Sequence, residues 1–267
     1  MLAVFSQVLW RRRLSLFWWS LGVLAMDGLL GVAYPTVRDN NELDKTFAGL
    51  PPSVQTMLGL HGGAKITSPI GYLDSQYFAN LLPIILLVFA IALAAWSVSG
   101  DEQAGTLELL LANPVSRIRV ALERAAALVV LLGVLTGVAA LGLVALAPST
   151  GLNNGLGPDR MIDAAIATGL LALVFASVAF AVGAATGGRS LAISVSVSIA
   201  VALFAIEGIA EQVNALQSIR AASPWHWLLQ TDPLRNGLVW EAWLLPTATS
   251  VVLIAAGTLI FARRDLR

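Results

Sequence analysis

The sequence contains no cysteine, and charged residues are scarce. Without cysteine the chain can form no disulfide, thiolate metal ligand or thiol nucleophile. Its two histidines, His61 and His226, fall in different predicted loops, which argues against a histidine metal centre. Charged residues make up only 12% of the chain and the formal net charge is zero, so charge gives no argument for a nucleic-acid partner.

Long apolar runs dominate the chain instead. Hydrophobic residues make up 57% of the 267 residues and the mean hydropathy is +0.80, which is outside the balance of ordinary soluble domains. A helix needs about 20 mainly apolar residues to cross a bilayer. The pattern therefore predicts an all-α, polytopic membrane protein with six transmembrane helices in one domain, residues 1–267. The predicted spans are residues 14–33, 79–98, 125–147, 164–186, 191–210 and 243–262.

Basic residues are distributed unevenly between the two sides of the predicted bundle. Short segments on one side are rich in arginine, whereas the longer loops on the other side hold fewer basic residues. Because basic residues are enriched in cytoplasmic segments, both termini are predicted to be cytoplasmic. The arginines on that side are Arg11, Arg12, Arg13, Arg117, Arg119, Arg124, Arg189, Arg263, Arg264 and Arg267. The first apolar run is longer than a signal-peptide core, so we expect a retained anchor.

The segment GLHGGAK, which begins at Gly59, matches a phosphate-binding loop only in part. That loop requires Gly directly before the Lys and Ser or Thr directly after it, whereas Ala64 and Ile66 flank Lys65. We therefore expect no ATP site in this chain. Paired catalytic acids, a serine with a base and a His-rich metal motif are also lacking, so the sequence predicts a chain that is not itself an enzyme and has no cofactor of its own.

Asp27 lies inside the first predicted span, about 20 Å from Leu14 along the helix. A carboxylate at such a depth is costly, and it is therefore a candidate functional residue. Asp27 could cap the outer half of the helix or pair with an arginine. It could instead bind a substrate or a proton, and the sequence leaves both interpretations open.

The fifth predicted span carries two further groups of polar residues. Glu207 and Glu211 are one helical turn apart and share a face at its outer end. We expect simple exposure there, with a gate or a substrate contact as the alternative. Ser190, Ser194 and Ser198 form a stripe at i, i+4 spacing. We expect this stripe to pack between helices, with a water-lined path as the alternative.

A charged segment, GDEQAGTLELLLANPVSR at residues 100–117, separates the second and third spans. Its spacing of about 100° per residue predicts an amphipathic helix over residues 101–112, which Asn113 and Pro114 end. The apolar face consists of Ala104, Leu107, Leu110 and Leu111. The opposite face consists of Asp101, Glu102, Gly105, Glu108 and Leu109. Helices that bind lipid usually have a basic polar face, so this acidic one favours a protein partner, with a solvated connector as the alternative.

The same segment resembles the segment that follows the second transmembrane span in permeases of type-2 ABC exporters. The matching residues are Glu102, Gly105, Thr106, Leu107, Glu108, Leu110, Leu111, Pro114, Val115, Ser116 and Arg117. Two further stretches also resemble this family: SPWHW at Ser223 with DPL at Asp232, and FARRDL at Phe261. With the six spans and both termini, the resemblance covers nearly the whole chain.

The resemblance implies a permease subunit in a bacterial cytoplasmic membrane. Two permease subunits, identical or homologous, would form a path at their interface in the lipid bilayer, and two cytoplasmic ATPase subunits would bind ATP and Mg²⁺. The segment at 101–112 would be the coupling helix that docks on the ATPase. The coupling residues would be Glu102, Gly105, Thr106, Leu107, Glu108, Leu109, Leu110, Leu111, Pro114 and Arg117. Candidate path or gate residues are Asp27, Ser194, Ser198, Glu207 and Glu211.

The sequence leaves alternatives open for the substrate and for the transport mechanism. Apolar spans with few charged residues favour export of an amphipathic compound such as a drug, a lipid or a peptide. A secondary transporter would need intramembrane charges near the midplane, for which Asp27 is the candidate. An ABC-type complex with a role other than export is the remaining alternative.

Overall fold

The computed structural model describes residues 3–51, 54–55, 65–103, 116–210 and 213–264. Within these ranges the regular structure is helical throughout, and six helical segments are long and apolar enough to cross a membrane. The predicted all-α fold with six spans is therefore confirmed. The helices of the first, third and fourth spans are α1 (Ala3–Arg38), α7 (Arg117–Thr150) and α8 (Pro158–Thr186). Those of the fifth and sixth are α9 (Arg189–Ile209) and α13 (Trp240–Arg263).

The second span consists of three consecutive helical segments and begins earlier than predicted. α4 (Pro69–Tyr72) starts after Ser68, whose side-chain oxygen accepts a hydrogen bond from the Gly71 N–H at 3.1 Å. The π-helix η2 (Leu73–Leu81) follows, and α5 (Leu82–Gln103) continues from it. Since α5 does not end at residue 98, the backbone of residues 101–103 continues the spanning helix. Residues 101–103, which were predicted to begin the separate coupling helix, therefore belong to α5.

Glycines end two of the spanning helices. α7 ends at Gly151, which has a φ of 83°, and its N–H donates to the Ala147 carbonyl. α8 ends in the same way at Gly187, where φ is 69° and the N–H donates to the Gly183 carbonyl. Only glycine adopts this left-handed conformation without a steric penalty, so both helices stop at a defined residue. The turn from α8 to α9 is consequently very short.

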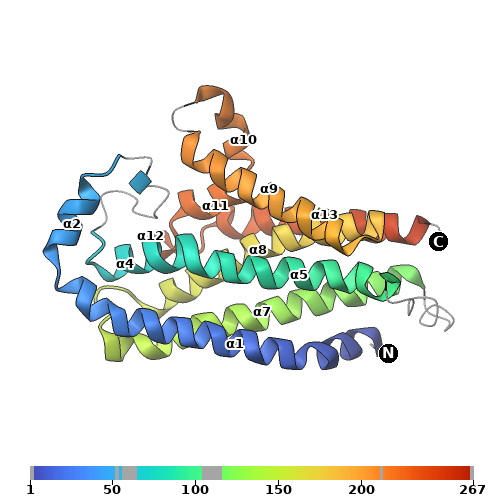
Figure 1. Cartoon of the computed structure of the whole chain (residues 1–267), viewed down its shortest axis with the longest axis horizontal. Coiled ribbons are helices and arrows are strands. Elements are labelled where there is room, and N and C mark those ends of the chain that lie inside the picture. The colour runs from blue at the N-terminus through green and yellow to red at the C-terminus, as the bar shows by residue number, and fades with distance from the viewer. Residues whose placement is uncertain (1–2, 52–53, 56–64, 104–115, 211–212, 265–267) are drawn as a thin grey trace.

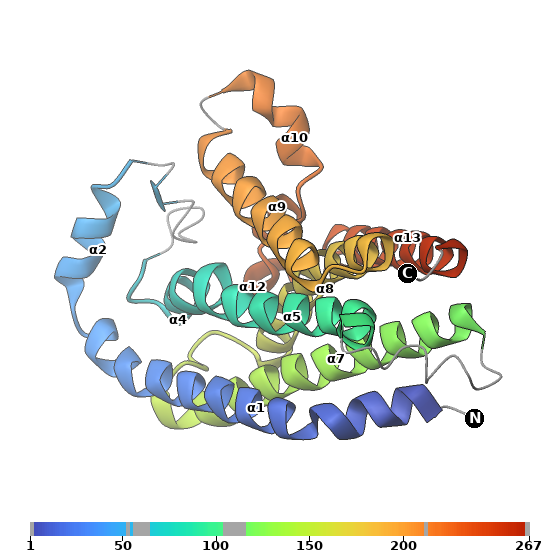
Figure 2. The ribbon, with the colours of Figure 1, turned by 45° about the vertical axis from the view of Figure 1, so that its right-hand side comes forward.

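The helix α8 lies at the centre of the bundle. α5, α7, α9 and α13 all pack against it, while α1 packs mainly against α7 (Figure 1). In the most apolar stretches of α8 and of the second span, 67% of the residues are buried within the chain, compared with 22% for α1 and 28% for α9 and α13. In Figure 2, α9 lies at the edge of the bundle, and its end toward α10 diverges from α5 and α8. The peripheral helices therefore leave large apolar surfaces for lipid or for another subunit.

The two ends of the bundle differ in character. The described parts of both termini, the last residues of α5 and the start of α7 lie at one end, here called the terminal end (Figure 1). At the opposite or distal end, the described part of the chain includes five short helices that lie outside the six spans. These are α2 (Asn41–Ala48), η3 (Asn214–Leu216), α10 (Gln217–Ala221), α11 (Pro224–Thr231) and α12 (Pro233–Asn236). None of the five is long enough to span a bilayer.

Candidate functional site

An apolar groove runs between the second span and α9. It has a volume of about 310 Å³. Asn80 is the one polar side chain among the described residues that line it. The lining residues are Ala79, Asn80, Ile84, Leu87, Val88 and Ile91 of η2 and α5, Val197, Ala200, Val201 and Phe204 of α9, and Trp225 of α11. The groove is therefore suited to the apolar part of a molecule.

Aromatic side chains form the distal part of the groove. The ring centroids of Phe204 and Trp225 are 4.8 Å apart. The Trp225 Nε1–H donates to the Ala200 carbonyl at 3.0 Å, so the polar atom of the indole is already satisfied. Trp225 is nearly completely buried and joins α11 to α9. This leaves an apolar aromatic surface with fixed orientation.

The groove is open on the side of the bundle. Ile84, Val88 and Val201 line it, and each is more than half exposed in the single chain. Because these residues lie within spanning helices, their exposed surfaces lie at the depth of the hydrocarbon core. An apolar molecule in the bilayer could enter the groove from this side.

The serine stripe lies on the exposed face of α9. Ser190, Ser194 and Ser198 are exposed, whereas Ser196 points into the bundle and donates to the Phe175 carbonyl at 2.6 Å. The expectation that the stripe packs between helices is therefore wrong within this chain, because that role belongs to Ser196. The water-lined path stays a prediction.

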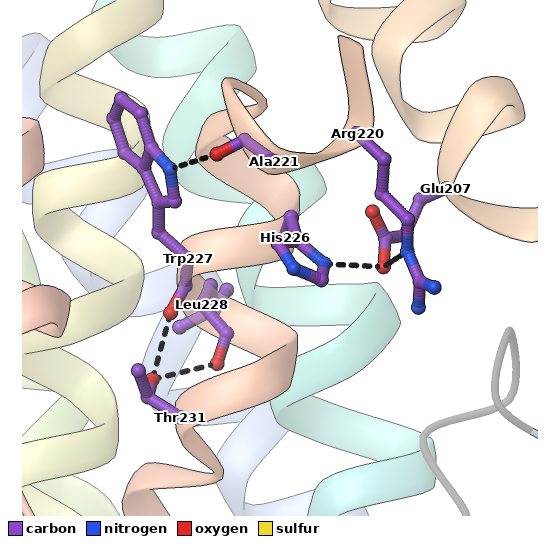
Figure 3. Close-up of polar contacts among 7 residues, drawn as sticks. All are labelled: Glu207, Arg220, Ala221, His226, Trp227, Leu228 and Thr231. Carbon is purple, nitrogen blue, oxygen red and sulfur yellow. Dashed lines mark hydrogen bonds and ion pairs between the residues drawn. The ribbon is translucent and has the colours of Figure 1, made fainter. Parts of the chain in front are cut away.

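Glu207 is buried in a cluster of charged and polar side chains at the distal end of α9 (Figure 3). Its Oε1 lies 2.9 Å from the Arg220 Nε and 3.0 Å from the His226 Nδ1. α10 provides the arginine and α11 the histidine, so the cluster joins three helices. The expectation that Glu207 is exposed at the outer mouth is wrong, since two partners stabilise its carboxylate inside the protein. Glu211 lies outside the described residues.

Asp27 is fully buried between α1, η2 and α7. Its Oδ1 accepts a hydrogen bond from the hydroxyl of Tyr77, and its Oδ2 faces Gly142, where an added Cβ would come within 2.5 Å. The partner is therefore a tyrosine rather than the arginine that the sequence left open. Asp27 is not among the described residues that line the groove. Its carboxyl therefore joins α1 to η2 by a hydrogen bond and lies against α7 at Gly142.

The structure thus brings only some of the candidate path residues near the groove. Ser194 and Ser198 share α9 with it, and Glu207 lies beyond its distal end. Sequence reasoning missed the two partners of Glu207, Arg220 and His226. The available signal was two basic side chains within 20 residues after a glutamate at the end of a span, but it does not specify the pairing.

The terminal end holds the remaining candidates. Residues 104–115 lie outside the described structure, and with them Gly105, Thr106, Leu107, Glu108, Leu109, Leu110, Leu111 and Pro114. Glu102 is described only as backbone, in the last turn of α5. Arg117 begins α7, and its Nη1 donates to the Arg264 carbonyl at 2.6 Å. The Nη1 of Arg264 in turn donates to the Ala184 carbonyl at 3.0 Å, so α7, α8 and the end of α13 are joined next to the predicted docking segment.

A family model described as ABC-2 family transporter protein matches residues 12–266. No curated protein matches the chain.

Proposed function

Since the chain belongs to the ABC-2 transporter family and is a multi-pass permease subunit of an ABC transporter, we propose that it exports an amphipathic compound. Permeases of this family associate with ABC ATPase subunits. In our proposal two permease subunits, identical or homologous, and two ATPase subunits form the assembly in a bacterial cytoplasmic membrane. ATP and Mg²⁺ are bound by the ATPase, and the permease contributes the path.

The single observation that carries the proposal is the apolar groove between the second span and α9. Its described lining contains no charged side chain, and it opens toward the depth of the hydrocarbon core. A second permease subunit that faces α9 would close the open side of the groove and enclose the serine stripe. Such an enclosure offers apolar surface to one part of a substrate and hydroxyl groups to another, which suits an amphipathic molecule.

The arginine distribution supports a cytoplasmic location for the terminal end. Arg117, Arg119, Arg189, Arg263 and Arg264 all belong to helix ends at that side of the bundle. Basic residues near span ends are enriched on the cytoplasmic side. Residues 101–112, which we propose as the ATPase-coupling segment, follow directly from the same end of α5.

The experiment fills the groove from its open side. Val201→Trp should lower ATP-dependent uptake of a lipophilic fluorescent dye into inverted vesicles by about tenfold, or about 1.4 kcal/mol, because the indole occupies the substrate position. Val252→Trp on α13 is the control, since Val252 is 65% exposed, compared with 62% for Val201, and is not among the described groove residues.

Three results would contradict the proposal. Equal uptake by the Val201→Trp and Val252→Trp proteins would show that the groove is not part of the path. Failure of the wild-type chain to purify with an ATP-hydrolysing subunit would contradict the proposed assembly. Uptake that proceeds without ATP would favour a secondary transporter instead.

A further inference from the structure

Two buried carboxyl groups face one small cavity near the distal end of the bundle. Asp74 belongs to η2, and Asp232 connects α11 to α12. Both residues are more than nine-tenths buried, at 7% and 9% exposure. Both line a cavity of about 10 Å³, which is about the space of one water molecule. Neither residue belongs to the groove or to the Glu207 cluster.

Each carboxyl group presents an oxygen atom without a hydrogen-bond partner in the described structure. These atoms are Oδ2 of Asp74 and Oδ1 of Asp232. The other carboxyl oxygen of Asp232, Oδ2, lies 3.1 Å from the Arg235 Nε. A buried polar atom without a hydrogen-bond partner is energetically costly. Two such oxygen atoms at one cavity therefore point to a bound species, such as a proton, a water molecule or an ion, that interacts with both.

The charges around the cavity do not balance if both carboxyl groups are ionised. Arg235 is the cation of the cluster, so two carboxylates would leave one negative charge in excess. The charged groups of the neighbouring elements have other described partners. On α8, Asp163 Oδ2 accepts from the Leu238 N–H at 3.2 Å and Arg160 lies 3.5 Å from Asp159.

The titratable groups on η2 and α11 also face elsewhere. Tyr77 of η2 bonds to Asp27, and His226 of α11 lies 3.0 Å from Glu207. No cation is among the described residues that line the cavity, and Arg235 adjoins it through its ion pair with Asp232. Two neighbouring carboxyl groups in a buried site cannot easily both ionise, so the excess charge favours binding of a cationic species.

The lining distinguishes a proton from a metal ion. Apart from the two aspartates, the lining side chains are apolar: Phe78, Ala164, Leu228, Leu229, Pro233 and Leu234. Calcium requires six to eight oxygen ligands, and magnesium requires octahedral coordination. Two carboxyl groups in an apolar pocket supply too few ligands for either ion. A proton needs only the two oxygen atoms, directly or through one bridging water.

We propose that Asp74 and Asp232 together bind one proton, taken up from solvent, between the second span and the α11–α12 connection. The shared proton satisfies the two free oxygen atoms and leaves a single negative charge opposite Arg235. The cluster is then neutral and holds the start of the second span to α11 and α12. Loss of the proton places two negative charges beside one guanidinium and weakens that connection.

Infrared spectroscopy of the full-length protein in detergent tests the proposal. The wild-type protein at neutral pH should show a carbonyl-stretch band of a protonated carboxylic acid. Asp74→Asn should remove that component, because asparagine has the shape of the protonated acid but no titratable proton. Asp39→Asn is the control: Asp39 is an exposed residue paired with Arg38 at 3.0 Å, and its replacement should leave the band unchanged.

The outcome is decided by the carboxylic-acid band and its response to ions. Asp232→Asn should remove the same band; if that variant does not fold because the Asp232–Arg235 ion pair is lost, the Asp74→Asn spectrum decides alone. An acid band of equal intensity in the wild-type and Asp74→Asn proteins would overturn the proposal. A carboxylate band that shifts on addition of Na⁺ or Ca²⁺ in the wild type, and not in Asp74→Asn, would also overturn it and identify a metal ion instead.

Discussion

Glu207 shows how this protein accommodates a charge at the end of a spanning helix. The carboxylate is buried, but Arg220 and His226 both contact the same oxygen atom, Oε1. Its Oε2 has no hydrogen-bond partner in the described structure. Burial of a carboxylate is tolerated because the two partners compensate the lost hydration. The cluster therefore depends on the charge of Glu207 and not only on its shape.

We expect Glu207→Gln to destabilise the protein, because the substitution leaves Arg220 half-buried without its carboxylate. Removal of one partner from a buried ion pair typically costs about 3–5 kcal/mol. Thermal unfolding of the purified protein in detergent measures the effect as a lower Tm. Glu42→Gln serves as the control, since Glu42 pairs with Lys45 at 2.8 Å on the exposed surface of α2. Equal Tm values for the two variants would contradict a structural role for the buried cluster.

At the scale of elements, the end of α5 and the start of α7 flank the proposed coupling segment. α5 continues to Gln103, and α7 begins at Arg117 with Ser116 as its N-cap. The Ser116 side-chain oxygen accepts a hydrogen bond from the Arg119 N–H at 3.4 Å. The Arg117 contact with Arg264 then joins this point to the end of α13. The segment is therefore attached at both ends to packed helices, through which a movement of the ATPase could reach the bundle.

We expect Leu109→Ala to weaken binding of the ATPase by about 30-fold, because a central apolar anchor is typically worth about 2 kcal/mol or more. Glu102→Gln should have a smaller effect that shrinks at high salt, since screening removes the charge contribution from the wild type as well. Pull-down of the ATPase and substrate-stimulated hydrolysis in reconstituted vesicles measure both effects.

Arg189→Ala is the matched control for the coupling variants. Arg189 is exposed at the start of α9, in a turn too short to contribute much to docking. Its replacement should leave ATPase binding within about threefold of wild type, because a single surface charge contributes about 0–1 kcal/mol. Full coupling in the Glu102→Gln, Leu109→Ala double variant would contradict the proposed docking segment. Loss of assembly in Arg189→Ala would locate a second docking site at the α8–α9 turn.

At the scale of the whole molecule, the two ends of the bundle differ in the residues that they offer to their surroundings. The terminal end gathers helix ends that carry arginine, whereas the distal end carries the short helices and the Glu207 cluster. Absence of cysteine from the natural chain means that a single introduced cysteine reports on one position only. The orientation of the entire bundle can thus be tested at two sites.

Asn153→Cys should react with an impermeant thiol reagent in intact cells, and Ser190→Cys should not. Asn153 is exposed in the distal turn between α7 and α8, while Ser190 is exposed at the terminal end of α9. Both sites avoid glycines with positive φ, where a side chain would strain the backbone. Labelling of both variants after permeabilisation verifies that each cysteine is accessible. The reverse pattern in intact cells would invert the proposed topology.

The sequence alone determined the all-α class, the six spans and the family resemblance. These follow from local properties: runs of about 20 apolar residues form helices in a bilayer because the backbone must satisfy its own hydrogen bonds there. The family resemblance likewise needs only the order of residues, and the family model that matches residues 12–266 confirms the family, whereas the coupling role of residues 101–112 stays a prediction. The exact ends of the spans were harder to predict, as the extension of α5 to Gln103 shows.

Only the tertiary structure decided which polar residues meet. Glu207 pairs with Arg220 and His226, Asp27 with Tyr77, and Asp74 shares a cavity with Asp232, although the last two residues are far apart in sequence. Helical periodicity places a residue on a face but does not specify the helix that covers that face. The bundle arrangement, with α8 at its centre and α9 at its edge, determines which carboxyl groups are buried and where the groove opens, because burial depends on neighbours that are distant along the chain.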